Sequence, residues 1–392
     1  MISRTERTPF AEWWWKLDRL MLAALGTLML GGIVLSLAAS PPVAARIGLD
    51  PFHFVNRHVT YLAPALVVLI ATSFLAPRHI RRVALLVFVV SIVLTAATLV
   101  FGAEVKGARR WIVLAGINIQ PSEALKPTLV ILIAWLFSES ARRPEMPANS
   151  VALALLFLVV GLLMLQPDFG QTMLVVLVWS ALFFMAGMGW IWVAGLAGTA
   201  LAGLGGAYFT IPHVATRIRR FLNKSSGDSF QVDTALESFA RGGWLGRGPG
   251  EGTVKRILPD SHADFVFAVA AEEFGIVLCL ALVGLFALIV LRALLHALRT
   301  EDAFTRLAVA GLAMLFGLQS AINMAVNLHL MPAKGMTLPF ISYGGSSLIS
   351  LAYGMGTLLA LMRGRPRAEM LGADLAGDPV AGPASDSARR AA

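Results

Sequence analysis

Ten apolar runs, each close to the length of a membrane-spanning helix, follow one another along this chain of 392 residues. A helix needs about 20 consecutive apolar residues to cross about 30 Å of hydrocarbon. The runs lie near residues 20–40, 57–77, 82–101, 121–138, 149–165, 169–187, 190–210, 266–295, 304–329 and 342–362. Hydrophobic residues make up 57% of the chain and charged residues only 14%, which is too apolar for a soluble domain of this length. The sequence therefore predicts an all-α polytopic membrane protein with about ten transmembrane helices.

These helices are expected to form one membrane domain over residues 20–365. A cytoplasmic segment, 1–19, precedes this domain, and a tail rich in Ala, Gly, Asp, Ser and Pro, 366–392, is predicted to be disordered. A large loop, 211–264, separates the seventh and eighth helices. Within this loop the apolar residues from Phe230 to Phe239 predict a short amphipathic helix on the outer membrane surface, bordering a substrate groove.

The distribution of Lys and Arg predicts that both termini are cytoplasmic. With the N-terminus inside, basic residues concentrate in the inner loops, as in the run from Arg78 to Arg82, while the short outer loops hold fewer. The large loop is basic although it falls outside, but the rule weakens for loops approaching about 60 residues. Its charge has two explanations, an ordinary solvated surface or a surface that binds an anionic partner.

The sequence gives no sign of a nucleotide site or of a dedicated metal site. His and Cys show no metal-ligand spacing, and there is neither a P-loop nor a dinucleotide fingerprint. The single cysteine, Cys279, excludes an internal disulfide.

The chemically distinctive stretches all fall at the outer ends of the predicted helices. They are EVKGARRW (104–111), QPSEALKP (120–127), QPDFGQT (166–172), PAKGMTLPF (332–340) and SYGGSS (342–347). QPSE is typical of a helix start, because Pro121 suits the first turn and Glu123 suits the positive N-terminus. SYGGSS is either a closely packed tight turn or a helix N-terminus whose N–H groups face a phosphate. Any chemistry is therefore expected at the outer face.

The stretch LPDSHADFVFAVAAEEFG, residues 258–275, enters the eighth helix and contains Asp264, Glu272 and Glu273 at or inside the predicted span. A carboxylate inside a bilayer costs a few kcal/mol, so such residues tend to be paired or functional. Lys126 lies at a similar depth, so we predict a structural intramembrane ion pair between Lys126 and either Glu272 or Glu273. Asp264, at the mouth of the helix, is either a helix N-cap or a general base that faces an aqueous groove.

Five motifs together resemble the SEDS family (shape, elongation, division and sporulation) over about residues 15–365. They are KGARRWI, QPSEALK, QPDFGQ, LPDSHADFVFAVAAEEFG and MPAKGMTLPFISYGGSSLI. The stretch PAKGMTLPFISYGGSS is similar to the division branch, since the elongation branch usually lacks its Lys and Thr. Asp260 and Ala263 depart mildly from the family's LPE-x-HTDF pattern, whereas Asp264 is kept.

The resemblance implies a glycosyltransferase of the bacterial inner membrane. It would polymerise lipid II, an undecaprenyl-pyrophosphate-linked substrate, into peptidoglycan strands at the outer face of the division septum. The family's catalytic aspartate maps onto Asp264, the candidate general base. The candidates for binding the substrate's pyrophosphate are Arg109, Arg110, Lys334, Arg217 and Ser346.

The same resemblance implies the cofactor and partners. A divalent cation, Mg²⁺ or Mn²⁺, is plausible, and no nucleotide is expected. The expected partners are a class B penicillin-binding protein (an FtsI-like transpeptidase) and other divisome proteins, with no nucleic acid.

Two other functions fit the same helices. The elongation paralogue would perform the same chemistry. A lipid II flippase also suits polytopic helices with intramembrane charges, but the short inner loops offer no distinctive motif for a second substrate face. A purely structural scaffold would leave Asp264 and the outer arginines without a role.

Overall fold

Each of the ten apolar runs coincides with a helix in the computed structural model, which confirms the predicted fold class. The structure describes residues 8–105, 107–114, 117–210, 215, 230–332 and 335–363. The helices are α2 (Arg19–Arg46), α3 (His53–Ser73), α4 (Pro77–Phe101), α5 (Ser122–Arg142), α6 (Ala148–Leu165), α7 (Phe169–Met185), α8 (Trp190–Thr210), α11 (Val266–Leu298), α12 (Ala303–Asn327) and α13 (Gly345–Leu361). Within the described residues, seven of them are long and apolar enough to cross a membrane, and α7 and α13 are shorter apolar helices.

The chain divides into two compact units, Asp18–Met362 and a smaller one made of 1–17 with 363–392. The described part of the smaller unit, residues 8–17 and 363, contains one helix, α1 (Pro9–Lys16), which was not predicted. The Thr8 hydroxyl caps it by accepting the Ala11 N–H at 3.2 Å. The predicted tail, 366–392, and nearly all of 211–229 lie outside the described residues.

Helices α5, α12 and α13 form the centre of the larger unit. In the most apolar windows of α5 and α12, 67% of the residues are buried, against 28% in α3, α4, α6 and α11. Nearly every residue of α13 is buried as well. The outer helices therefore keep apolar side chains exposed, as expected where lipid rather than protein covers a helix.

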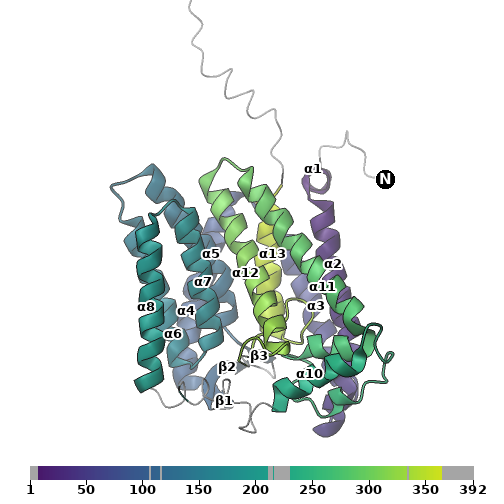
Figure 1. The fold of residues 1–392 in the computed structure, drawn as a ribbon. Coiled ribbons are helices and arrows are strands. Elements are labelled where there is room, and N and C mark those ends of the chain that lie inside the picture. The colour runs from purple at the N-terminus through teal and green to yellow at the C-terminus, as the bar shows by residue number, and fades with distance from the viewer. Residues whose placement is uncertain are drawn as a thin grey trace, which may run out of the picture. The chain divides into compact units, whose positions relative to one another are not determined.

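The helices run alternately up and down, and one end of the larger unit carries the irregular structure (Figure 1). A small antiparallel sheet, in the order β1 (Ala103–Val105), β2 (Ala108–Leu114) and β3 (Ile117–Ile119), lies between α4 and α5. Glu104 pairs with Arg109 across the first two strands. The sequence did not predict this sheet.

A short helix, α10 (Phe230–Gly242), lies at the same end as the sheet (Figure 1). It confirms the short helix predicted inside the large loop. Val232 is buried and Phe239 packs against the same cluster, whereas Phe230 is 51% exposed. Part of its apolar side therefore contacts protein, and its position on a membrane surface stays a prediction.

Helix α11 is broken at Gly275, which has φ of 81° and ψ of 180°. The break leaves backbone groups of the helix without their usual partners, and residues 243–248 supply new ones. Arg247 and Gly248 donate their N–H groups to the carbonyls of Glu272 and Glu273, both at 3.0 Å. The loop after α10 is thereby joined to α11 on both sides of the break by backbone hydrogen bonds, which satisfy groups that would be costly to leave unpaired in a membrane.

Candidate active site

Asp264 lies in the loop between the single turn η2 (Val254–Arg256) and α11. The N-cap position of α11 is Phe265, which makes no side-chain cap bond, so the N-cap interpretation of Asp264 is wrong. The Asp264 carbonyl instead accepts amide N–H groups from Asn323 at 2.9 Å and from Asn327 at 3.0 Å. The carboxylate is half-buried, and its Oδ2 would lie 3.6 Å from a β-carbon built on Gly335.

Asn323 and Asn327 connect three segments around Asp264. Asn323 also donates to the Met336 carbonyl at 2.6 Å, and Asn327 Oδ1 accepts the Ala268 N–H, in the first turn of α11, at 3.1 Å. Our reading of the sequence missed both asparagines. The sequence feature that could have identified them is the four-residue spacing from Gln319, which places three amide side chains on one face of an otherwise apolar helix.

The loop that follows α12 lies against the loop that carries Asp264. The Ser342 hydroxyl donates to the Ala263 carbonyl at 2.6 Å and accepts the Leu338 N–H at 2.8 Å. The Tyr343 N–H donates to the His262 carbonyl at 3.0 Å. The motifs HAD and LPFISY, 74 or more residues apart in the chain, are thus joined by one side-chain and one backbone donor, which bond the carbonyls of Ala263 and His262.

SYGGSS forms a closely packed helix start, in agreement with the packing interpretation. A β-carbon on Gly345 would clash with the Tyr61 ring at 2.7 Å. The Ser346 hydroxyl accepts the Gln120 N–H at 2.9 Å and donates to the Asn118 carbonyl at 3.4 Å. Ser346 therefore joins α13 to the end of the sheet, and its predicted role at a phosphate stays a prediction.

The predicted pairing of Lys126 with Glu272 or Glu273 is wrong. Lys126 Nζ lies 2.8 Å from Glu123 Oε2 and donates to Gln319 Oε1 at 3.4 Å. Residues three apart on a helix are neighbours, so the partner within α5 is the nearer one. Lys126 and Glu123 are 4% and 8% exposed, and Glu123 also accepts an N–H from Gln171 at 3.1 Å.

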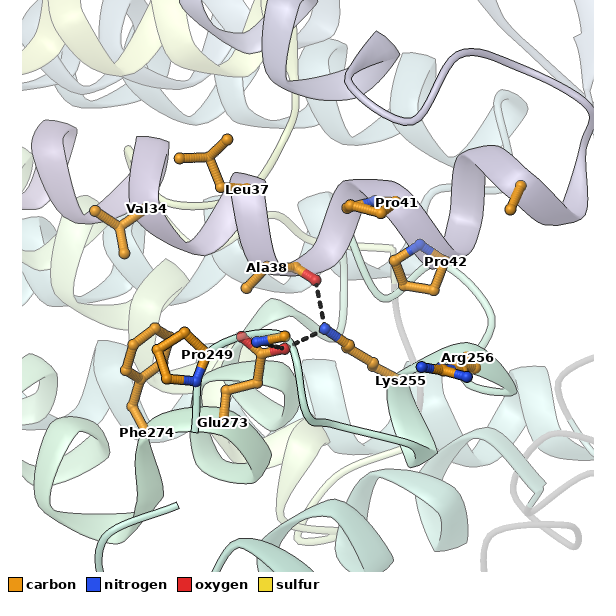
Figure 2. Close-up of a pocket in the computed structure, with 12 residues that line it drawn as sticks. Val34, Leu37, Ala38, Pro41, Pro42, Pro249, Lys255, Arg256, Glu273 and Phe274 are labelled. Carbon is orange, nitrogen blue, oxygen red and sulfur yellow. Dashed lines mark hydrogen bonds and ion pairs between the residues drawn. The ribbon is translucent and has the colours of Figure 1, made fainter. Parts of the chain in front are cut away.

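Glu272 and Glu273 are structural, as predicted, but they hold the loop before Asp264. The Glu272 carboxylate accepts the backbone N–H groups of Thr253, Val254 and Lys255 at 2.6 to 2.9 Å. Glu273 pairs with the Lys255 ammonium, which also donates to the Ala38 carbonyl on α2 at 3.0 Å (Figure 2). The two glutamates thus fix η2 to α11 and to α2.

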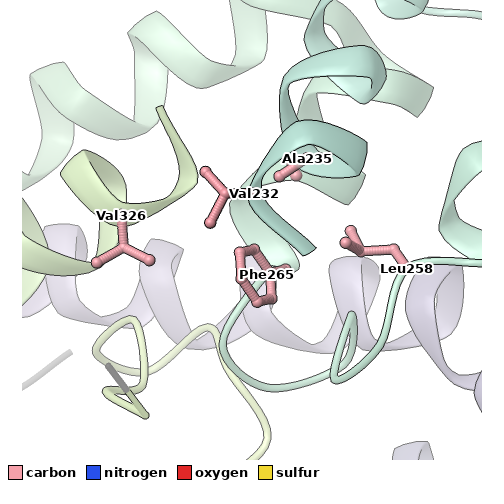
Figure 3. Close-up of a cluster of buried hydrophobic side chains, with 6 residues drawn as sticks. Val232, Ala235, Leu258, Phe265 and Val326 are labelled. Carbon is pink, nitrogen blue, oxygen red and sulfur yellow. The ribbon is translucent and has the colours of Figure 1, made fainter. Parts of the chain in front are cut away.

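An apolar cluster holds the Asp264 loop from another side. Phe265, the next residue, packs with Leu258, with Val232 and Ala235 of α10 and with Val326 of α12 (Figure 3). All five are 6% exposed or less. The predicted helix α10 therefore supports the segment that carries Asp264.

The two described arginine candidates have partners within the protein. Arg110 donates to the carbonyls of Gln166 and Pro167, at 2.8 and 2.6 Å, and pairs with Asp168 at 3.2 Å. Burial raises the pKa of the Asp168 carboxyl, while the Arg110 guanidinium opposes that rise. Arg109 lies 3.4 Å from Glu104 in an exposed pair.

Two further candidates, Lys334 and Arg217, lie outside the described residues. In the part of the chain that the structure describes, no three His, Cys, Asp or Glu gather as a metal site.

Comparisons with known proteins match this chain to one protein family. Residues 18–366 match the model of the family described as cell cycle protein, which covers FtsW, RodA and SpoVE. The probable peptidoglycan glycosyltransferase FtsW of Caulobacter vibrioides is 46% identical over 367 residues, which cover 93% of this chain and 94% of that protein. The protein of the same name from Trichlorobacter lovleyi is 33% identical over 368 residues, with 91% and 96% covered.

Solved structures with a similar fold include proteins of peptidoglycan synthesis and rod shape determination. A chain of a peptidoglycan synthase complex that coordinates polymerization and crosslinking has a TM-score of 0.76 at 30% identity, covering 90% of this chain and 99% of that chain. The rod shape determining protein RodA of Thermus thermophilus has a TM-score of 0.66 at 29% identity, with 90% and 98% covered.

Proposed function

Because the chain belongs to the FtsW, RodA and SpoVE family of cell cycle proteins and is a peptidoglycan glycosyltransferase, we propose that it polymerises lipid II during septal wall synthesis. The FtsW relative is 46% identical, whereas the solved RodA is 29% identical, which favours division over elongation. The multi-pass helices suit a substrate that is anchored in a membrane.

In the proposed orientation both termini are cytoplasmic, and the end that carries the sheet, α10 and Asp264 faces outward. The concentration of Lys and Arg in the inner loops supports this orientation. Outer-leaflet lipid II would then reach the Asp264 loop directly, at the division septum of the inner membrane.

The reaction would exchange one bond to the donor sugar for another. An acceptor hydroxyl oxygen bonds to the anomeric carbon while the bond from that carbon to the pyrophosphate oxygen breaks, and the pyrophosphate leaves with the electron pair. Asp264 takes the hydroxyl proton as general base. Positive groups near the outer face neutralise the departing pyrophosphate, for which Lys334, Arg217 and Arg109 are the candidates.

The position of Asp264 is the observation that best supports its proposed role as general base. Its backbone is held by Asn323 and Asn327, while its carboxylate is directed toward the Gly335 loop rather than used as a helix cap. A base that is positioned by rigid neighbours is pre-organised for proton transfer. Arg110, which bonds the 166–168 turn, has a positioning role in this proposal.

A divalent cation, Mg²⁺ or Mn²⁺, is part of the proposal and would be bound by Asp264 together with the substrate's pyrophosphate. It would supply positive charge to the leaving group. The proposed partner is an FtsI-like class B penicillin-binding protein with transpeptidase activity, together with other divisome proteins. The similarity to a chain from a synthase complex that combines polymerization with crosslinking supports such a partner.

Polymerisation of purified lipid II by the purified protein, alone and with its transpeptidase, tests the proposal. Asp264→Asn should lose about 10²–10⁴-fold in rate, because the amide cannot take the proton. Asp260→Asn is the matched control: it lies in the same loop, and Asn tolerates its positive φ of 51°. The control should stay within a few-fold of wild type, and both variants should unfold at the wild-type temperature. If Asp264→Asn polymerises lipid II as fast as Asp260→Asn, Asp264 is not the base.

A further inference from the structure

A cavity of about 720 Å³ lies between α2 and the loop that joins α10 to η2 (Figure 2). This volume falls within the range of about 300–1,000 Å³ that is typical of small-molecule sites. Its described lining comes from α2, from residues 249–256 and from Glu273 and Phe274 of α11, and does not include Asp264 or the two asparagines that hold it. It is therefore a concave site separate from Asp264, at the same end of the bundle.

Two adjacent prolines shape one wall of the cavity. Pro42 has no N–H, so it cannot donate a hydrogen bond to the Ala38 carbonyl one turn earlier. Pro41 likewise cannot donate a hydrogen bond to the Leu37 carbonyl. Lys255 takes the place of the missing donor at Ala38, at 3.0 Å, and is neutralised by Glu273. The Lys255 charge is thus already compensated, and its role at the cavity is structural.

Arg256 supplies the uncompensated charge of the cavity. Its side chain is exposed, and within the described residues its guanidinium has no hydrogen-bond or ion-pair partner. Figure 2 shows Arg256 beside Pro42 at one end of the cavity, while Val34, Leu37 and Phe274 lie toward the other end. The cavity is therefore cationic at the helix end and apolar toward the middle of the bundle.

The apolar end opens toward the surface that lipid would cover. Val34 and Leu37 are 49% and 45% exposed although they belong to a helix that is long and apolar enough to span a membrane. From Val34 to Pro42 the helix rises about 12 Å, the depth of part of one leaflet. A ligand that fits this arrangement has an anionic head near the membrane surface and an apolar chain that points inward.

We propose that this cavity binds an anionic phospholipid of the bilayer, with its phosphate at Arg256 and an acyl chain along Val34, Leu37 and Phe274. A guanidinium matches the geometry and charge of a phosphate group. The polymerisation substrate is assigned to Asp264, so the amphiphile left for this cavity is the surrounding lipid. The bound lipid holds α2 against the loop that leads, through Leu258, to Asp264.

Lipid binding to the purified full chain tests this without any turnover, by native mass spectrometry in detergent with one added lipid at a time. The lipids are phosphatidylglycerol, phosphatidylcholine and undecaprenyl phosphate. Wild type should bind phosphatidylglycerol better than the other two. Arg256→Gln should weaken that binding about five- to tenfold, the effect of one basic residue at an anionic lipid surface.

Two further variants make the test specific. Arg247→Gln removes an exposed arginine from the same loop but outside the cavity lining, and it should bind phosphatidylglycerol as wild type does. Leu37→Trp fills the apolar end and should weaken the binding of phosphatidylglycerol while the unfolding temperature is kept. Equal losses for Arg256→Gln and Arg247→Gln would overturn the proposal. So would a lack of preference over phosphatidylcholine, or binding of undecaprenyl phosphate alone.

Discussion

The buried pair of Lys126 and Glu123 makes a quantitative prediction about stability. Lys126→Met keeps most of the side-chain length but removes the ammonium, and it leaves Glu123 in a place where only 8% of the residue is exposed. Removing one partner from a buried ion pair costs about 3–5 kcal/mol, because the remaining charge is buried without compensation. We expect Lys126→Met to lower the free energy of unfolding by this amount.

A double-mutant cycle identifies the partner. Adding Glu123→Gln removes the stranded charge and keeps an acceptor for the Gln171 amide, so the double variant should be more stable than the sum of the single losses by about 1–3 kcal/mol. The same cycle with Glu273→Gln should be additive within about 0.5 kcal/mol, since Glu273 is paired with Lys255.

The assay is unfolding in mixed micelles, followed by tryptophan fluorescence, with lipid II polymerisation as a second readout. Additive losses for Lys126 with Glu123 would refute the pairing that the structure shows. A coupling of 1 kcal/mol or more between Lys126 and Glu272 or Glu273 would restore the pairing that the sequence suggested.

Three more predictions concern the break in α11, the 166–168 turn and the cation. Gly275→Ala should destabilise the fold by several kcal/mol, because a β-carbon at a φ of 81° would clash with the Trp244 carbonyl. The control Gly284→Ala, in the same helix with open space around it, should be neutral or stabilising by up to about 1 kcal/mol in thermal unfolding. Arg110→Gln should lose about 1–3 kcal/mol of stability through the turn; a variant of wild-type stability with a raised KM for lipid II would instead place Arg110 on the substrate. EDTA should abolish polymerisation and Mg²⁺ or Mn²⁺ should restore it, whereas full activity in EDTA would remove the cation from the proposal.

The helices could be predicted because the bilayer imposes a length that can be counted along the sequence. The run near 20–40 is α2 and the run near 342–362 is α13, each displaced by only a few residues at the ends. The sheet could not be predicted in this way. Two of its three strands, Ala103–Val105 and Ile117–Ile119, have three residues each, too short to show an alternating pattern.

The partner of Lys126 could not be predicted for a geometric reason. Depth along a helix follows from residue number, at about 1.5 Å per residue, and it places Lys126 near the level of Glu272. The rotation of each helix and the path of the connecting loop decide which groups meet. The loop at Thr253–Lys255 returns to Glu272 and Glu273, so these acids are bonded by residues that precede them in the chain.

The three acids that enter α11 differ in what their oxygens already bind. Glu272 is fully buried with its carboxylate bonded to three backbone N–H groups, and Glu273 is paired with Lys255, so neither is available to take a proton from a substrate. A carboxylate that caps a helix is likewise committed to N–H groups and favoured in its ionised form, which would make it a weak base. Asp264 is not placed as such a cap, because α11 begins two residues later without a side-chain cap bond, and the asparagines of α12 hold Asp264 through its backbone carbonyl. The loop thus receives its rigidity from Glu272, Glu273 and the amides, which hold the half-buried Asp264 carboxylate in position for the proposed chemistry.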